Sequence, residues 1–588
     1  MGWEGWLTLV VLLVAIVIMV RDIVAPVVAI LGATIFLYVF DVIDAAQAFS
    51  GFSNPAPLTI AVLYVLAAAA SRSGALQPLV RSTLSADASD RTNLARLLPP
   101  VAAASSILNN TPIVAVLVPE IRSWARRHGR QVSRLLMPIS FAAILGGTIT
   151  VIGTSTNLVI SGLLEASGEE PLGFFELAPI GIPIVLGGLT MLMLLAPRIL
   201  DRAAANQRHP AELAREWVID LRVRHGNRLD GLTVEATGLH NLARVELRRI
   251  DTPDEILKPP PPSHVLRGGD MMRFVGNIYD VSDLLSLPGL STEEVDLLEF
   301  DRGQAMFFEA VIGPSSGLVG RNARQSGMRS RYRAAMLAIH RPSGDVTARL
   351  NSVIFESGDK LVVVANPDFQ EQWRDHRDFL LVSPLTANLP PVVRYRLIVA
   401  AILAAVVIVA GLGIVSILRA ALVGAVAVIG LRILTPTQIA QSIDVRVVVL
   451  VASGFGLGEA MTSSGLAQVI ADGITATLGG LGNYGALAAV VLVTIVLTES
   501  ISNTAAALIV FPVAIETAQN LSIDARGFAV AVALAASASF LTPVGYQTNA
   551  MVQAPGGYRF RDYTRLGFPL TTMVFIAIMI GVPIFWPF

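Results

Sequence analysis

The chain has 588 residues, of which 53% are hydrophobic and only 15% are charged. Charged residues usually make up about a quarter of a soluble domain, so this composition indicates an integral membrane protein. The formal net charge of −1 gives no reason to expect nucleic acid as a partner. There is no cysteine, which excludes disulfides and cysteine-based metal sites.

Apolar segments follow one another from the start of the chain. The segment at 6–20 has no basic leader and runs into a second apolar segment, so we interpret it as a retained membrane helix rather than a signal peptide. A helix needs about 20 apolar residues to cross the hydrocarbon core. We expect membrane helices at 6–20, 23–40, 57–70, 135–163, 175–195, 397–415, 417–434, 447–461, 486–497, 527–541 and 566–585.

Arginines between these segments predict their orientation, because Lys and Arg in short loops stay on the cytoplasmic side. The segment at 97–121 has arginine-rich loops at both ends, so we expect it to enter the membrane and return as a re-entrant hairpin. Its polar middle, 108–112, would form a tip buried in protein or lining a cavity. A crossing helix with a polar kink is the alternative.

Two short polar motifs occur in both halves of the chain. Asn109-Asn110-Thr111 corresponds to Ser502-Asn503-Thr504. A pentapeptide running from Gly to Asn follows each triplet, at 153–157 and 545–549, and its Asn lies 47 residues after Asn110 and 46 residues after Asn503. The shared order and spacing predict an internal repeat.

The predicted fold class is a polytopic α-helical membrane protein, built as an inverted repeat of five transmembrane helices plus one re-entrant hairpin each. The number of crossings per half is odd, so the second half runs with the opposite topology. Broken helices of such repeats meet near the membrane midplane, where free carbonyls bind cations and helix N-termini bind anions. Asn, Ser and Thr suit these breaks because they offer oxygens and N–H donors without burying a full charge.

Each half also places a hydroxyl five residues before the central Asn, at Ser105 and Thr498. This hydroxyl, the Asn and the Gly of the pentapeptide could form one cation site per half, although interhelical packing is the alternative role for such polar residues. Glu499 lies three residues before Ser502 and could carry a proton instead, or cap a turn locally. Further acidic candidates are Glu120, Glu459 and Glu516.

These paired triplets and pentapeptides resemble the divalent anion/sodium symporter family of the ion transporter superfamily, over about 1–198 and 394–588. The resemblance implies Na⁺-coupled uptake of a dicarboxylate, tricarboxylate or sulfate by a homodimer with an elevator mechanism. It implies cation ligands at Ser105, Asn109, Asn110 and Gly153 in the first half, and at Thr498, Ser502, Asn503 and Gly545 in the second. The anion would contact Asn110, Thr111, Asn503 and Thr504, with Thr154, Ser155 and Tyr546 nearby.

The sequence departs from that family pattern at two places. Asn109 stands where the family usually has Ser, and Ser155-Thr156 and Gln547-Thr548 stand where carboxylate carriers usually have two prolines. The stretch 545–549 together with Gly556-Gly557-Tyr558 resembles the sulfate-type carriers, which favours sulfate slightly over a C4-dicarboxylate.

The middle of the chain, from about 201 to 382, is richer in charge and reads as a soluble α+β insert. Strands are predicted at 243–250, 271–275, 334–339 and 360–364. Gly231, Gly238 and Gly269-Asp270 recur 89 residues later, as Gly320, Gly327 and Gly358-Asp359. The two units resemble TrkA-C domains, which implies pairing and binding of a small ligand, in some relatives a nucleotide; a passive dimerisation module is the alternative.

The predicted domains are a first transmembrane repeat at 1–198, TrkA-C-like units at 199–293 and 294–385, and a second transmembrane repeat at 386–588. We expect a multi-pass protein of the cell membrane with a cytoplasmic insert, acting as a Na⁺-coupled anion symporter. A ligand-gated channel and a non-transporting sensor are the alternatives, and proton coupling is the alternative to Na⁺. An enzyme is not indicated, because no nucleophile, base and orienting group stand together in the sequence.

Overall fold

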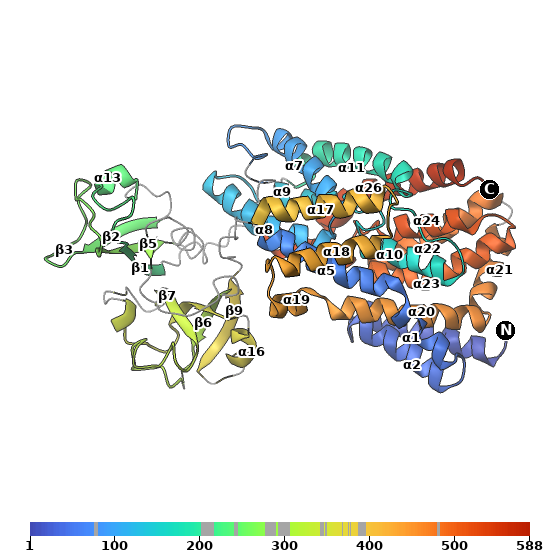
Figure 1. The fold of residues 1–588 in the computed structure, drawn as a ribbon, viewed down its shortest axis with the longest axis horizontal. Coiled ribbons are helices and arrows are strands. Elements are labelled where there is room, and N and C mark those ends of the chain that lie inside the picture. Colours follow the sequence, from blue (N-terminus) through green and yellow to red (C-terminus); the bar gives the residue numbers. More distant parts are fainter. Residues whose placement is uncertain are drawn as a thin grey trace. The chain divides into compact units, whose positions relative to one another are not determined.

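The computed structural model describes residues 1–75, 80, 82–200, 217–239, 245–276, 290–291, 306–314, 316–341, 346, 350–366, 368–373, 376, 378–385, 395–478 and 482–588. The chain forms two compact units, a helical unit of residues 1–207 and 393–588 and an insert of residues 208–392 (Figure 1). The predicted boundaries at 201 and at 293/294, and the start of the strand predicted at 243, lie outside the described residues.

The helical unit contains two series of helices. The first series is α1 (Trp3–Val20), α2 (Pro26–Val39), α3 (Ala45–Ala48), α4 (Ser50–Ser53), α5 (Pro55–Arg72), α7 (Asp90–Ser105), α8 (Asn110–Arg127), α9 (Ser133–Gly146), α10 (Ser155–Ala166) and α11 (Ala178–Ile199). The second is α17 (Arg396–Gly411), α18 (Ile417–Gly430), α19 (Pro436–Ser442), α20 (Val445–Ser463), α21 (Leu466–Leu478), α22 (Gly482–Ser500), α23 (Asn503–Asn520), α24 (Ala525–Ala536), α25 (Gln547–Gly556) and α26 (Phe560–Phe585). Helices α11 and α26 pack against each other (Figure 1).

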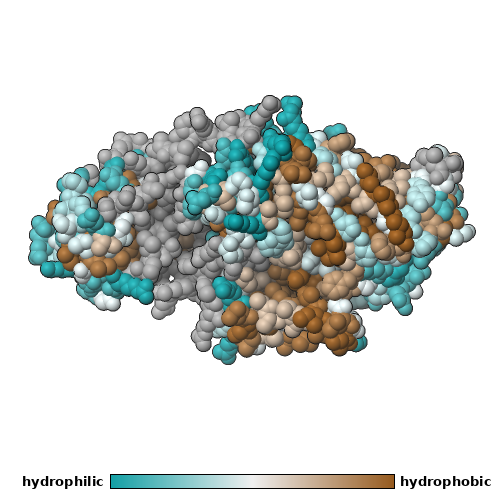
Figure 2. Space-filling view, turned by 90° about the horizontal axis from the view of Figure 1, so that it is seen from above, coloured by the Kyte–Doolittle hydropathy of each residue, from teal (hydrophilic) through white to brown (hydrophobic). Residues whose placement is uncertain are grey.

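Six of the described helices are long and apolar enough to cross a membrane, namely α1, α5, α11, α20, α22 and α26. Large apolar side chains remain exposed on these and neighbouring helices, as a soluble protein would not allow. Figure 2 shows a broad band of apolar residues on the helical unit, with hydrophilic residues beyond the band. Exposed large apolar side chains of these and the neighbouring helices include Val10, Val17, Leu186, Val423, Val426, Val496 and Ile580.

The apolar segment at 135–163 was predicted as one helix, and this prediction is wrong. Helix α9 ends at Gly146 and α10 begins at Ser155, so residues 147–154 form a break. The unwound stretch was placed too late in the sequence as well, because Ser155 and Asn157 already belong to α10. In the second half the corresponding break spans 537–546, between α24 and α25. The polar residues that were expected in the breaks therefore lie largely in the first helical turn that follows.

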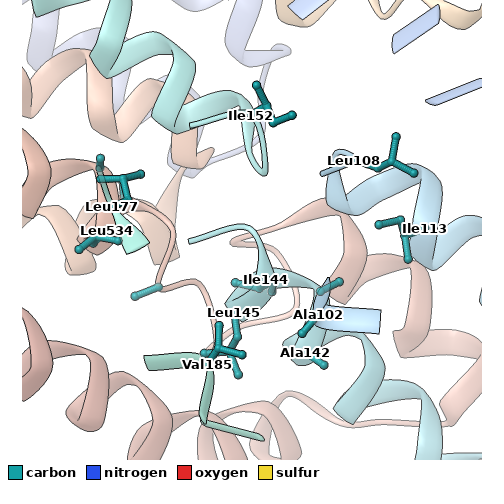
Figure 3. Close-up of a cluster of buried hydrophobic side chains, with 14 of the residues drawn as sticks. Ala102, Leu108, Ile113, Ala142, Ile144, Leu145, Ile152, Leu177, Val185 and Leu534 are labelled. Carbon is teal, nitrogen blue, oxygen red and sulfur yellow. The ribbon is translucent and has the colours of Figure 1, made fainter. Parts of the chain in front are cut away.

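The core of the helical unit surrounds these breaks. Figure 3 shows buried side chains from α7, α8, α9, α11 and α24, with Leu108 and Ile152 from the connecting segments. Helices α7 and α9 approach closely at Gly146, where an added Cβ would lie 2.2 Å from the carbonyl oxygen of Ala102. Only a glycine allows this approach, and it fixes the distance between α7 and α9 at the start of the first break.

The insert is built on an antiparallel sheet. Its strands are β1 (Trp217–Val223), β2 (Val245–Asp251), β3 (Ile256–Leu257), β4 (Met271–Gly276), β5 (Leu290–Ser291), β6 (Met306–Ile312), β7 (Ala334–His340), β8 (Lys360–Ala365) and β9 (Phe379–Leu385). They pair in the order β3-β2-β4-β1-β7-β8-β6-β9, and β5 pairs with β1. The four strands predicted from the sequence are present as β2, β4, β7 and β8. Short helices α13 (Val234–Thr237) and α16 (Phe369–Trp373) and a 3₁₀ turn at Leu350–Ser352 complete the described elements.

The two parts of the insert share one strand arrangement. Strands β1, β2, β4 and β5 begin 89 residues before β6, β7, β8 and β9, and β4 and β5 pair with β1 as β8 and β9 pair with β6. The glycines match in backbone conformation, with φ of 89° at Gly231 and 80° at Gly320. Their N–H groups donate to equivalent carbonyls, those of Leu266 at 2.8 Å and Phe355 at 3.0 Å. Pairing of β1 with β7 joins both parts into one sheet.

Candidate functional site

The two polar triplets lie where one helix ends and the next begins. Helix α7 ends at Ser105 and α8 begins at Asn110, and across this gap Ser105 Oγ donates to Asn110 Oδ1 at 2.5 Å. In the second half, Thr498 Oγ1 donates to Asn503 Oδ1 at 2.9 Å. All four side chains are buried. Each predicted pair of hydroxyl and amide therefore closes its own turn, which we call the first tip (106–111) and the second tip (501–504).

The two later asparagines tie the helix breaks together. Asn157 Nδ2 donates to the carbonyl oxygens of Gly147 at 3.1 Å and Thr150 at 2.9 Å, both within the first break. Asn549 Nδ2 makes the corresponding bonds in the second break, to Ser539 at 2.8 Å and Thr542 at 3.2 Å. Carbonyls left free by unwound backbone are thus held in fixed positions by a side chain from the next helix.

The first tip contacts the second break. Asn110 Nδ2 donates to the Tyr546 hydroxyl at 3.1 Å, and Thr111 Oγ1 donates to Gln547 Oε1 at 3.2 Å. Helix α8 packs against α25, and α23 packs against α10. Each tip is therefore followed by a helix that packs against the helix after the other half's break, and polar residues far apart in the sequence meet in one region.

Four neutral oxygens gather at the second tip. Thr498 Oγ1 lies 2.9 Å from Asn503 Oδ1, 2.5 Å from the Ala536 carbonyl oxygen and 3.3 Å from Ser539 Oγ. Ser539 Oγ donates to the same Asn503 oxygen at 2.5 Å. Hard cations prefer oxygen ligands of this kind, and the two hydroxyls can turn their lone pairs inward when a cation replaces the hydrogen bonds. This cluster could hold Na⁺.

Sequence reasoning missed Ser539 and the Ala536 carbonyl. Ser539 lies ten residues before Asn549, and the position ten residues before Asn157 is Gly147, so comparing the two halves gives no hint of a ligand there. The Ser537-Ala538-Ser539 run at the end of an apolar segment was the available signal.

The two predicted glycine ligands lie beside the tips. A Cβ at Gly545 would lie 3.1 Å from the Thr498 carbonyl oxygen, so Gly545 adjoins the oxygen cluster. A Cβ at Gly147 would lie 3.0 Å from Asn110 Oδ1 and 3.2 Å from the Gly153 carbonyl oxygen. The backbone around Gly153 therefore reaches the first tip through Gly147.

Ser502 and Asn109 differ from the other predicted cation ligands. Ser502 Oγ accepts from the N–H of Ala505 at 3.3 Å and caps α23, so it does not join the oxygen cluster. Asn109 Oδ1 is buried and has no hydrogen-bond partner among the described residues. The structure gives neither side chain a bond to the predicted cation ligands of its own tip.

Glu499 caps the second break. Its carboxylate is 9% exposed and accepts from the backbone N–H groups of Phe540 and Leu541, both at 2.7 Å, and of Thr542 at 2.9 Å. Three backbone donors on one carboxylate are the local capping role that the sequence allowed as the alternative to proton transfer. Glu459 on α20 is exposed and accepts a single long bond from Gln47, 3.4 Å.

The helices that follow the two breaks differ in how many of their buried polar side chains have a hydrogen-bond partner. Ser140 Oγ on α9 donates to Asn549 Oδ1 at 2.8 Å and lies 2.9 Å from Thr548 Oγ1. The residue in the same position on α24 is Val532, 17 residues before Asn549 as Ser140 is 17 before Asn157. In the described part of the chain, Thr156 Oγ1 and Asn157 Oδ1 are buried without a partner. A valine cannot donate the bonds that a serine donates.

The sequence comparisons agree on one class of protein. The citrate transporter family matches residues 13–535 of this chain. The chain belongs to this family. Among curated proteins, this chain is 34% identical to a putative sulfur deprivation response regulator of Chlamydomonas reinhardtii. The similarity covers 96% of this chain and 98% of the relative.

Other relatives are named as transporters. An uncharacterized transporter of Synechocystis sp. is 32% identical to this chain, over 97% of this chain and 95% of the relative. Sodium/sulfate cotransporter 1 of Chlamydomonas reinhardtii is 23% identical over 98% and 89%. The expected membership in a family of membrane transporters is confirmed, and the relatives give no support for an enzyme.

Proposed function

We propose that this citrate transporter family member is a secondary active transporter that carries a divalent anion together with Na⁺, with sulfate preferred over C4-dicarboxylates. The observation that carries the proposal is the cluster of four neutral oxygens around Thr498 and Asn503, next to a tip that also offers hydrogen-bond donors. A cation bound to these oxygens would fix Asn503 and so link cation binding to the shape of the anion site.

The anion would bind through neutral donors at the tips and breaks. Thr154 precedes α10 and Tyr546 precedes α25, and neither side chain caps its own helix. Neither N-cap side chain occupies the first N–H groups of its helix, and helix N-termini attract anions. Names of relatives favour sulfate, since several are called sodium/sulfate cotransporters, whereas the family description points to citrate.

The remaining features of the proposal follow the family resemblance. The two helix series act as inverted repeats in an elevator-type homodimer in the cell membrane, and the two TrkA-C-like units form a cytoplasmic module that regulates transport on binding a small ligand such as a nucleotide. The domain limits proposed from the sequence, 1–198, 199–293, 294–385 and 386–588, serve as guides for dissecting these roles.

The proposal is tested with purified protein in sealed proteoliposomes. We expect concentrative uptake of labelled sulfate when Na⁺ is imposed outside, and no accumulation when K⁺ replaces Na⁺. Succinate, citrate and phosphate are compared as competitors, and a proton gradient without Na⁺ tests the alternative coupling. Accumulation driven by protons alone, or flux that only dissipates a gradient as a channel would, contradicts Na⁺ symport.

A non-transporting sensor is the second candidate. It is favoured by one observation, the similarity over nearly the whole chain to a putative sulfur deprivation response regulator. A sensor would still bind sulfate with Na⁺, measured as thermal stabilisation of the purified protein, but would show no uptake in the same vesicles.

A further inference from the structure

The two tips carry similar donors but face different side chains. At the first tip, Asn110 Nδ2 and Thr111 Oγ1 are already bonded to Tyr546 and Gln547 of the second break. The Tyr546 hydroxyl also lies beside the side chains of Thr111 and Thr154. The second break thus places a phenol and an amide over the donors of the first tip.

The residues that correspond to Tyr546 and Gln547 in the first half are smaller. Tyr546 and Gln547 lie three and two residues before Asn549, and the residues at the same distances before Asn157 are Thr154 and Ser155. Helix α23, which begins at the second tip, packs against α10, which begins at Ser155. The positions that cover the first tip with long side chains therefore carry only short hydroxyl side chains in the other half.

Some donors at the second tip have no protein partner among the described residues. Within the described residues, Asn503 uses its Oδ1 as an acceptor and its Nδ2 donates no hydrogen bond. In the same part of the chain, no hydrogen bond involves the hydroxyls of Thr504 or Ser155, whereas the Thr154 hydroxyl lies beside that of Tyr546. Buried donors without a partner cost free energy, and an anion with several oxygens would satisfy them.

We propose that Tyr546 and Gln547 set the substrate class, by closing the first tip so that the site takes one compact tetrahedral dianion at the second tip. A C4-dicarboxylate has two separated carboxylates, and in a duplicated site each carboxylate needs the donors of one tip. A tetrahedral anion carries both charges on one centre and needs only one tip. This inference rests on the proposed function, since it names which divalent anion the transporter accepts.

The difference between the two tips in side-chain size and in free donors is large enough to discriminate sulfate from a C4-dicarboxylate. A buried donor that loses its partner to a poorly fitting ligand weakens binding, and sites built around such donors reject mismatched ligands strongly. To reach Asn110 and Thr111, a second carboxylate must displace two existing hydrogen bonds and the Tyr546 ring. Sulfate displaces neither.

The test uses a variant in which the end of the second break has the same residues as the end of the first. The double variant Tyr546→Thr with Gln547→Ser gives residues 546–549 the sequence Thr-Ser-Thr-Asn that occupies 154–157. Thermal stabilisation by sulfate and by succinate is titrated in saturating Na⁺ for the full-length protein and for the variant. We expect the affinity ratio of sulfate to succinate to fall at least about tenfold in the variant, mainly because succinate binds more tightly.

Tyr563→Phe is the matched control. Its hydroxyl is buried in the same half and donates to the Asn549 carbonyl oxygen at 2.7 Å, without contact to either tip. The control should leave the ratio unchanged. A ratio unchanged in the double variant, while sulfate still stabilises it, overturns the inference but not the proposed function. A wild-type protein that succinate stabilises as well as sulfate also overturns it, whereas stabilisation by neither anion counts against the proposed function itself.

Discussion

At the second tip, the hydroxyl group of one threonine belongs to the candidate cation site, whereas that of a nearby threonine makes only a local hydrogen bond. Thr498 Oγ1 lies within 3.3 Å of three other oxygens, from Asn503, Ala536 and Ser539. Thr494, one turn earlier on α22, is equally buried, but among the described residues its hydroxyl bonds solely to the Val490 carbonyl of its own helix. Substituting each threonine in turn therefore distinguishes the loss of a cation ligand from the loss of a hydroxyl within a helix.

We expect Thr498→Val to weaken Na⁺ binding at least about tenfold, because it removes one oxygen ligand and keeps the side-chain shape. Thr494→Val removes a hydroxyl of the same size and should leave Na⁺ affinity unchanged. Both are measured as Na⁺-dependent thermal stabilisation of the purified protein. Equal Na⁺ affinities in the two variants would remove Thr498 from the cation site.

Glu499 offers a second comparison at this scale. We expect Glu499→Gln to lower stability by about 1–3 kcal/mol, because an amide nitrogen would face a backbone N–H that now has a carboxylate acceptor. Glu459→Gln, at an exposed position, should have no effect on the Tm. If Glu499 is a cap, uptake by its variant stays Na⁺-driven; complete loss of uptake in a variant with an unchanged Tm would instead indicate a proton carrier.

Among the elements, the helix breaks depend on residues that permit close backbone approach. Gly146→Ala should reduce the yield of folded protein sharply, since its Cβ would lie 2.2 Å from the Ala102 carbonyl oxygen and force α7 away from α9. Gly473→Ala on α21 meets nothing within 4 Å and should be neutral or slightly stabilising. Size-exclusion profiles and Tm values in detergent compare the two. A monodisperse Gly146→Ala protein with wild-type Tm would show that this contact is not needed.

In the insert, the ionisation of Asp378 makes the stability of the fold depend on pH. Burial alone would raise the pKa of Asp378, but hydrogen bonds from Tyr332 and the Gly317 N–H, with His376 and Arg331 nearby, lower it below its ordinary value. A lowered folded-state pKa stabilises the insert above the unfolded value of about 4, and this contribution is lost as the pH falls further.

We therefore expect Asp378→Asn to destabilise the insert at pH 7 and to flatten its acid transition below about pH 4. Trp373, whose ring centroid lies 4.6 Å from that of Tyr332, reports the transition by fluorescence, with Trp373→Phe as the blank. An unchanged acid midpoint in Asp378→Asn would show that this carboxylate does not set it.

Several elements could be predicted from the sequence because their signals are local. Strands β2, β4, β7 and β8 are apolar or alternating runs, whereas β1 and β6 were missed because each carries an acidic residue in mid-strand. Asp220 of β1 pairs with Arg273 of β4 at 2.7 Å, and Glu309 of β6 lies 4.0 Å from Lys360 of β8. Such pairs join different strands, so no single run of sequence reveals that the charges are compensated.

The candidate site was only partly predictable for the same reason. Triplets and pentapeptides located the tips and the helices after the breaks, because Asn and Gly at matched spacing are visible in one sequence. Ser539 and Ser140 were missed, since each has no polar counterpart in the other half. The contact of Asn110 with Tyr546 joins residues 436 positions apart and depends on how the halves pack.

For the whole molecule, the division into two compact units predicts separable functions. Replacing residues 205–385 by a flexible linker should retain Na⁺-dependent stabilisation by sulfate, because every residue of the candidate site lies in the helical unit. Asn503→Ala in the full-length protein should do the reverse, keeping a folded insert but losing stabilisation and uptake. Complete loss of folded protein on deletion would assign the insert a structural role instead.

Ser140 on α9 has Val532 as its counterpart on α24, and this single difference makes the two halves unequal. The helix after the second break receives a side-chain hydrogen bond from Ser140, while Thr156 Oγ1 and Asn157 Oδ1 after the first break have no partner among the described residues. The two halves are then not interchangeable, and loading and release of the proposed cargo need not be mirror images of each other.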